Sequence, residues 1–260
     1  MNEDNLADVL RSNGVDATSL VPLFKTLQPP SYRLSATGSD AVRLWLQLRG
    51  LVEATGHWPL ILGGDEDLEG YEEMLDYVVW PPAADEMPAV ERLLQEAVQL
   101  DTDVWLRERV AAEPEYYDLD DLLTGNWPDQ ASPQRGFNVP AQVVSGGPLP
   151  VVYVALVPTT VGWQVPAYLG WGGWNECPEP DEHAAMMKRW GERYGAEVVC
   201  MSRDVVGMRV AQPPMDREAA LALAREQFIY CADIVIQGTN TLENLAATLI
   251  GAEVWYFWWD

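Results

Sequence analysis

The chain has 260 residues, of which 40 are acidic and 16 are basic, and its formal net charge is −24. Hydrophobic residues make up 48% of the chain, including 12 Trp and 10 Tyr, so it has enough apolar material for a folded core and is not a disordered acidic tail. A charge this negative repels phosphate groups, which argues against nonspecific binding to nucleic acid or to an anionic membrane and favours a basic partner.

The first residues and the cysteines predict a cytoplasmic protein. The segment MNEDN is acidic where a secretory signal needs basic residues, and no apolar stretch follows it. The longest apolar run, residues 151–157, is much shorter than the roughly 20 residues that a membrane helix needs. Three cysteines without a close pairing motif make a disulfide framework improbable, which agrees with a reducing compartment.

Residues 1–123 are predicted to form a mainly helical region with at least one strand. Residues 40–55 carry apolar side chains at helical spacing and end at Gly56, and residues 58–62 (WPLIL) form a short apolar run typical of a buried strand. Residues 86–112 predict one long amphipathic helix.

This first region is also the most acidic part of the chain. Residues 65–121 contain 19 acidic and three basic residues, which account for two-thirds of the net charge. Residues 124–148 follow with four prolines and four glycines, a composition that cannot sustain a helix or an internal strand. We therefore predict a linker at 124–148 between an acidic N-terminal region and a C-terminal α+β domain at 149–260.

The C-terminal domain is predicted to have the order β-α-β-β-α-(α)-β. This is the ferredoxin-like arrangement, and we expect its helices to cover one face of the sheet and the N-terminal half to cover the other. The predicted strands are 149–157, 197–201, 205–211 and 254–259, and the predicted helices are 181–194, one beginning after Asp216, and 242–250.

One group of acidic residues in the first region could indicate a calcium site, but a simpler explanation exists. Residues Asp65, Asp67, Glu69, Gly70 and Asp76 match a calcium-loop pattern imperfectly, because position 12 is Asp and a strand precedes the pattern. An acidic segment that opens a helix explains the same residues and is favoured.

Cysteine and histidine residues give no better case for a metal or for catalysis. Cys177, His183, Cys200 and Cys231 lack the C-x2-C spacing of zinc sites, and buried structural thiols are the favoured interpretation. A Cys177/His183 nucleophile pair is possible by composition, but His183 lies on the packed side of its helix, where a hydrogen-bonded structural histidine is expected. We predict no cofactor, no metal and no catalytic residue, and favour a protein that is not an enzyme.

The segment GWGGWNECP, residues 170–178, combines aromatic and hydrogen-bonding side chains with three glycines. Such a loop is typical of a recognition site, although the two tryptophans could instead fill a gap between the two halves of the protein. The candidate ligand-binding residues are Trp171, Trp174, Asn175, Glu176 and His183.

The segments GWGGWNECP, RWGERYGAEVV, DREAALALAREQFIYCADIV and the terminal WYFWWD resemble the bacterial domain-of-unknown-function family numbered 4253. The resemblance covers about residues 149–260, and AVRLWLQLRG with TGHWPLIL resembles the upstream part of many members. Where the family often has Cys-Pro-Asp, this chain has Cys231-Ala232-Asp233. The family implies no reaction, cofactor or catalytic residues.

We expect a noncatalytic acidic module that docks a basic protein, as an immunity protein, an antitoxin or an inhibitor would. The alternative is an enzyme or small-ligand sensor with a site in a cleft around the GWGGWNE loop. The sequence does not indicate an oligomeric state. The candidate partner-binding residues are Asp65, Asp67, Glu69, Glu72, Glu73, Asp101, Asp103 and Glu108.

Overall fold

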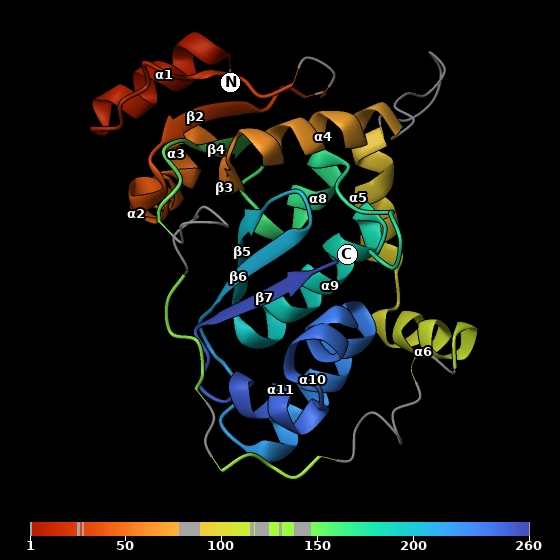
Figure 1. Cartoon of the computed structure of the whole chain (residues 1–260). Coiled ribbons are helices and arrows are strands. Elements are labelled where there is room, and N and C mark those ends of the chain that lie inside the picture. Colours follow the sequence, from red (N-terminus) through yellow and green to blue (C-terminus); the bar gives the residue numbers. More distant parts are fainter. Residues whose placement is uncertain are drawn as a thin grey trace. The chain divides into compact units, whose positions relative to one another are not determined.

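The computed structural model describes residues 2–24, 27, 29–77, 89–114, 117, 125–129, 132–137 and 147–259, with the side chains of residues 76 and 77 excepted. The chain forms two compact units (Figure 1). Unit 1 contains residues 1–94, 138–171 and 198–203, and unit 2 contains residues 95–137, 172–197 and 204–260. Both units contain helices and strands, which confirms the predicted α+β class.

Unit 1 holds five of the seven strands in the described part of the chain. Its strands are β1 (Val21–Pro22), β2 (Tyr32–Ala36), β3 (Trp58–Gly63), β4 (Val152–Val157) and β5 (Ala196–Met201), whose first two residues count with unit 2. Its helices are α1 (Glu3–Ser12), α2 (Gly38–Arg49), α3 (Val52–Thr55), α4 (Asp65–Tyr77), the short η1 (Gly162–Gln164) and α8 (Val165–Leu169), while α5 (Ala89–Gln99) is divided between the units.

The strands of unit 1 lie in the order β1-β2-β4-β3-β5. Strand β4 is antiparallel to both β2 and β3, with Leu34 opposite Val154 and Leu60 opposite Ala155, and β3 is parallel to β5. All of β3 is buried, because helices cover it, and Trp45 of α2 donates a hydrogen bond to the carbonyl of Pro59 at 2.9 Å. The buried strand predicted at residues 58–62 is therefore confirmed.

The ferredoxin-like topology is not confirmed. That topology would place the last strand of the domain beside the first, but both sides of β4 are taken by β2 and β3 from the N-terminal part of the chain. Element order alone does not determine which strands pair, and the five-residue β2 was not predicted. Much of the predicted linker at 124–148 lies outside the described residues.

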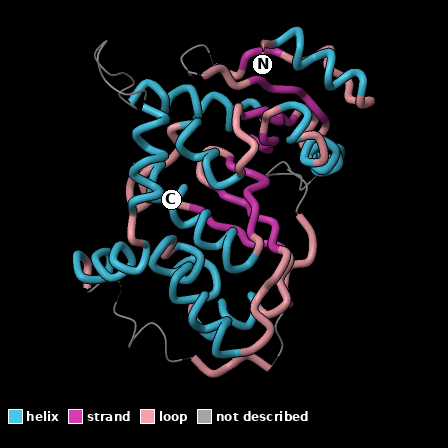
Figure 2. The backbone as a smooth tube through the Cα atoms, turned by 180° about the vertical axis from the view of Figure 1, so that it is seen from behind, coloured by secondary structure: helices cyan, strands magenta, loops and turns pink. Residues whose placement is uncertain are grey.

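Unit 2 contains the two strands β6 (Val205–Val210) and β7 (Val254–Trp258), which pair antiparallel. Its helices are α6 (Thr102–Ala112), α9 (Pro180–Tyr194), α10 (Arg217–Tyr230), the π-helix η2 (Ile234–Thr239) and α11 (Leu242–Leu249). Figures 1 and 2 both show α10 and α11 side by side, in agreement with their contacts.

Aromatic side chains form the core of unit 2. The ring of Trp190 on α9 stacks on Phe257 of β7 at 5.4 Å, and Tyr230 of α10 meets Phe257 edge to face at 5.0 Å. Such ring pairs add stability beyond their buried area. One face of the final strand thus packs on the two helices, as the sequence predicted.

Two predicted helices are each divided in the structure. The helix predicted at 40–55 is divided into α2 and α3, and Gly56 ends α3 in the left-handed conformation with φ of +68°. The first residues of the helix predicted at 86–112 lie outside the described part of the chain, and the rest is divided into α5 and α6. A second helix, α6, starts after residue 101 because the Asp101 carboxylate accepts hydrogen bonds from the backbone of Asp103 and Val104.

Among the described residues, none of the helices combines the length and the apolar character that crossing a membrane requires.

Candidate functional site

Helix α4 carries most of the candidate partner-binding residues and begins where two glycines end strand β3. Gly63 has φ of +102°, and a Cβ atom there would collide with the Asp67 side chain. The carboxylate of Asp67 accepts a hydrogen bond from the backbone N–H of Gly64 at 2.8 Å, so it fixes the start of the helix. Asp67 is therefore half-buried and engaged within unit 1.

The opposite side of α4 is anchored in the core of unit 1. Tyr71 is buried, donates its hydroxyl hydrogen to the carbonyl of Met201 at 2.7 Å and stacks on Phe24 at 6.2 Å. The helix cannot rotate about its axis without breaking this bond, so the face away from Tyr71 is held toward solvent.

Carboxylates occupy that solvent face. Glu66, Glu69, Glu72 and Glu73 are all exposed. Glu66, Glu69 and Glu73 are three or four residues apart and lie in one row along the helix, and Glu72 lies beside this row, three residues after Glu69. Within the described part of the chain, none of the four forms an ion pair. Asp65 is also exposed and accepts a hydrogen bond from the hydroxyl of Tyr153 at 2.7 Å. We call Glu66, Glu69, Glu72 and Glu73 the α4 acidic row.

The calcium-loop pattern is not a loop in the structure, because residues 65–77 are helical. Alternate residues of a helix point in different directions and cannot wrap one cation. Among the residues that the structure describes, no three carboxylate, imidazole or thiol side chains gather closely enough to hold a metal ion.

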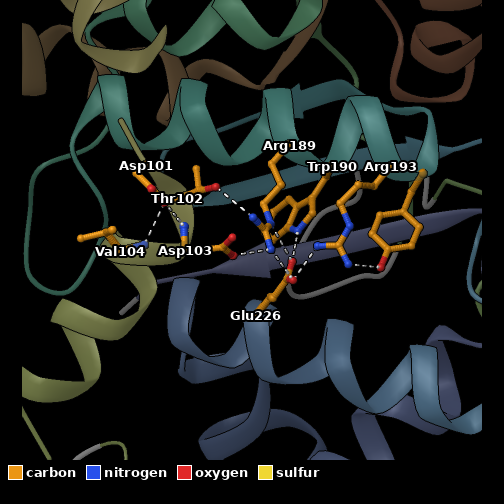
Figure 3. Close-up of polar contacts among 9 residues, drawn as sticks. Asp101, Thr102, Asp103, Val104, Arg189, Trp190, Arg193 and Glu226 are labelled. Atoms are coloured by element: carbon orange, nitrogen blue, oxygen red, sulfur yellow. Dashed lines mark hydrogen bonds and ion pairs between the residues drawn. The ribbon is translucent and has the colours of Figure 1, made fainter. Parts of the chain in front are cut away.

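The other three candidate partner-binding residues belong to α6 in unit 2, and two of them serve unit 2 itself. Asp101 caps the helix, and Asp103 forms an ion pair with Arg189 at 2.9 Å (Figure 3). Glu108 is exposed, with no ion pair among the described residues.

Arg189 belongs to a polar network centred on Glu226, which the sequence analysis missed. The carboxylate of Glu226 accepts hydrogen bonds from Arg189 at 2.9 and 3.2 Å, from Arg193 at 2.6 Å and from the indole of Trp190 at 3.2 Å (Figure 3). Burial disfavours the charged form of Glu226, but the hydrogen bonds from the two arginines outweigh it and lower its pKa. The network joins α9 to α10, and through Asp103 to α6.

The GWGGWNECP segment is divided between the units after Trp171. Trp171 is completely buried in unit 1 and donates its indole hydrogen to the carbonyl of Ser202 at 2.9 Å. In unit 2, Trp174 is half-buried, and Asn175 and Glu176 are exposed. Asn175 has φ of +46°, a conformation that asparagine tolerates better than most residues.

Arg109 of α6 holds this segment from within unit 2. Its guanidinium donates to the backbone carbonyl of Glu176 at 2.8 Å and to that of Ile229 at 3.2 Å. The sequence contains one indication of this role, namely that Arg109 is a basic residue among the apolar positions of an amphipathic helix. The exposed side chains of Asn175 and Glu176 thus lie on a fixed backbone.

Cys177, near the end of this segment, comes together with His183 in unit 2. The Cys177 sulfur lies 3.3 Å from Nε2 of His183, and Nδ1 of His183 lies 2.6 Å from the Tyr230 hydroxyl. His183 is completely buried, and burial lowers its pKa, with a smaller contribution from Arg109. Burial raises the pKa of the Cys177 thiol. Both groups are therefore neutral, as expected for a hydrogen-bonded buried histidine.

Cys177, His183, Cys200 and Cys231, which the sequence did not favour as a zinc site, form no metal-binding group among the residues that the structure describes. Cys177, His183 and Cys231 belong to unit 2, whereas Cys200 lies in the part of β5 that belongs to unit 1. All three cysteines are free thiols.

The C-terminal part of the chain is similar to one known protein family. Residues 153–260 match the family model described as a domain of unknown function, DUF4253. No curated protein and no solved structure gave a significant match. The matched region contains Cys177, His183, Tyr230 and Glu226, whereas α4 and α6 precede it.

Proposed function

We propose that the protein is a noncatalytic binding module that docks a basic protein through the α4 acidic row. The observation that supports this proposal is the set of four exposed carboxylates that lie on one side of helix α4 and form no ion pair within the described part of the chain. Partners with the required chemistry include a cationic toxin, which an immunity protein or antitoxin would neutralise, or a basic enzyme. The proposal includes a cytoplasmic location.

The dimensions of the row suit electrostatic docking. From Glu66 to Glu73 the helix rises about 10 Å at 1.5 Å per residue. This is close to the screening length of about 10 Å at 0.1 M salt, so the four charges act together on an approaching cationic surface. Steering of this kind raises the association rate and is lost as salt increases.

The α4 row is a better docking surface than the α6 candidates. Reversing the charge of Asp101 or Asp103 would remove a helix cap or an ion pair to Arg189, and would destabilise unit 2 whatever its role in binding. In contrast, Glu69, Glu72 and Glu73 make no such contacts in the described residues, so their replacement changes the surface charge alone.

The experiment has two steps. A photo-crosslinking residue at position 69, and another at the exposed position 53 as a control, are used in a cell extract to trap proteins that contact α4. The trapped partner is then purified, and its affinity is measured by calorimetry for the triple variant Glu69→Lys, Glu72→Lys, Glu73→Lys.

The matched control is Glu53→Lys, Glu113→Lys, Glu253→Lys. These three residues are exposed, and the control changes the net charge by the same amount. We expect the α4 variant to lose at least about 100-fold in affinity, or roughly 3 kcal/mol, and the control to lose less than tenfold. Equal losses in the two variants would show that total charge, not α4, determines binding.

A second candidate function is an enzyme or small-ligand sensor at the GWGGWNE segment. The specific observation in its favour is the contact between two neutral side chains, Cys177 and His183, where Cys177 directly follows the exposed Asn175 and Glu176 in the chain. Thermal-shift screening with metals and metabolites tests it, because a specific ligand stabilises the folded state. A ligand whose shift disappears in Glu176→Ala supports this function, and the absence of any shift counts against it.

A further inference from the structure

Two stretches of the predicted linker lie in extended form on the surface of unit 2. They are residues 125–129 and 132–137, none of which belongs to a helix or a strand and none of which is buried. We call these two stretches the strap, and Figure 1 shows the first of them passing below α11. Because no side chain of the strap is part of the core, its contacts can break without opening the core of unit 2.

The first residue of the strap lies against the start of α11. The backbone N–H of Gly125 donates a hydrogen bond to the Glu243 carboxylate at 3.2 Å. A Cβ atom at position 125 would lie 2.8 Å from Oγ1 and 3.0 Å from Cβ of Thr241, the residue that caps α11. A side chain at this position would therefore push the strap away from Thr241.

The next contact is a stack of Trp127 on Arg217. The guanidinium carbon lies 4.4 Å from the centre of the indole ring, within the distance at which a cation is attracted to an aromatic ring. Arg217 is the first residue of α10, where a positive charge opposes the helix dipole, and it forms no ion pair within the described part of the chain. Pro128 disfavours a helical conformation of Trp127 and keeps the strap extended here. Helix stability does not account for Arg217, whereas the stack on an aromatic ring does.

The second stretch of the strap contacts β7. The backbone N–H of Glu253 donates to the carbonyl of Gln134 at 2.9 Å, and the ring of Phe137 meets that of Tyr256 edge to face at 6.2 Å. Strand β7 pairs with β6 and stands last in the strand order of the described sheet. Extended peptides bind at sheet edges by this combination of a main-chain hydrogen bond and side-chain contacts.

The residues that hold the strap belong to a different part of the sequence from the strap itself. They lie within residues 153–260, the part that matches the family model, whereas the strap precedes it. We call them the strap-binding surface, and they are Arg217, Thr241, Glu243, Glu253 and Tyr256.

One apolar side chain next to this surface is left uncovered by the strap. Met215 lies two residues before Arg217 and is 75% exposed, more than any other large apolar side chain in the part of the chain that the structure describes. Methionine adapts its shape to different ligands and is common at surfaces that bind peptides. A segment longer than the strap would gain this contact.

We propose that the strap is an autoinhibitory segment, which occupies a surface of unit 2 that receives an extended Gly-x-Trp-Pro segment of a partner protein. The strap itself indicates the chemistry that fits. Its glycine lies against Thr241, its tryptophan stacks on Arg217, and the following proline keeps the chain extended. Since only surface contacts hold the strap, a partner segment with the same pattern competes with it for the same residues.

The test measures binding of a fluorescent peptide with the sequence of residues 125–137 to the full chain by fluorescence anisotropy. A tethered segment has an effective concentration of about millimolar, so the strap of the wild-type protein should largely exclude the peptide. The variant Trp127→Ala, Phe137→Ala lacks both rings of the strap, and we expect it to bind the peptide at least about tenfold more tightly than wild type does. Equal affinity of the two proteins, or no binding to the folded variant, overturns the proposal.

Two further changes, both measured with the strap variant, test the assigned contacts. A peptide that carries Gly125→Val should bind at least about tenfold more weakly, because its side chain would collide with Thr241. Adding Arg217→Ala to the protein should weaken binding about two- to fivefold, the contribution of an exposed cation–π contact. The matched control is Arg225→Ala, an exposed arginine on the same helix, which should leave the affinity unchanged. A peptide whose affinity depends on neither Gly125 nor Arg217 binds elsewhere and contradicts the proposal.

Near-ultraviolet circular dichroism establishes that each variant is folded. Because no described residue of the strap is buried, we expect both the double variant and the single variant Trp127→Ala to fold. If the double variant unfolds, the same peptide measurement is made with Trp127→Ala. Unfolding of both variants would show that the strap is an integral part of the fold and not a displaceable segment, and would overturn the proposal.

Discussion

Replacing Glu226 by Gln should weaken unit 2 because it removes the charge at the centre of the polar network of Figure 3. The Glu226 side chain is 13% exposed, and it accepts hydrogen bonds from Arg189, Trp190 and Arg193. Glutamine has the same size, so the substitution tests the charge with little change in packing.

The expected loss follows from the partners that remain. A hydrogen bond to a charged group contributes about 1.5–3 kcal/mol, and two arginines lose such bonds. Arg189 keeps Asp103 and Thr102 as acceptors, and Arg193 is 39% exposed, so water replaces part of its lost bond. We therefore expect the free energy of unfolding to fall by roughly 2 kcal/mol.

Urea unfolding followed by circular dichroism measures this loss. The control is Glu192→Gln, whose ion pair with Lys188 is exposed and should contribute less than about 0.5 kcal/mol. Because the pKa of Glu226 is lowered in the folded state, its contribution is present above the unfolded pKa and disappears as pH falls through the folded value, below 4.5. Wild type and Glu226→Gln should therefore converge in stability at low pH. A Glu226→Gln variant as stable as Glu192→Gln at neutral pH would refute the reasoning.

Three further substitutions test local features of the fold by the same unfolding measurement. Asp101→Ala removes the cap of α6 and should cost about 1 kcal/mol, and a loss below about 0.3 kcal/mol would contradict that role. Tyr71→Phe removes the hydrogen bond to Met201 and should cost about 1–2 kcal/mol, whereas an unchanged stability would mean that the bond does not hold α4. Gly172→Ala should cost more than about 2 kcal/mol because its Cβ would lie 2.2 Å from the carbonyl of Pro178, and a fully stable variant would show that this segment relaxes easily.

Local patterns predicted most elements of the C-terminal part. The apolar run at residues 149–157 became β4, Asp216 caps α10 as expected, and Gly195 ends α9 in the left-handed conformation. These features depend on residues within one turn or one strand, where propensity and capping decide the outcome. The start of α9 is the exception, since its cap is Glu179, two residues before the predicted start of the helix, and Glu179 forms a capping box with Glu182.

Long-range features were not predictable in the same way. Nothing in the sequence of β2 indicates that it pairs with β4, and that pairing replaces the ferredoxin-like order. At the candidate sites, the concentration of acidic residues identified most of the exposed carboxylates of α4, but it did not indicate that Asp67 and Asp103 are engaged internally. The contact of His183 with Tyr230 joins residues 47 positions apart, so only the fold reveals it.

The central claim, that the α4 acidic row docks a basic protein, is tested most directly by the salt dependence of association. The partner that crosslinking identifies is purified in its free form and mixed by stopped flow with wild type, with the Glu69/Glu72/Glu73 charge reversal and with the Glu53/Glu113/Glu253 control. The association rate of each protein is measured from low to high salt. The account predicts a steep decline with salt for wild type and control, and a slow, nearly salt-independent rate for the α4 variant. The same steep decline in all three proteins would contradict it.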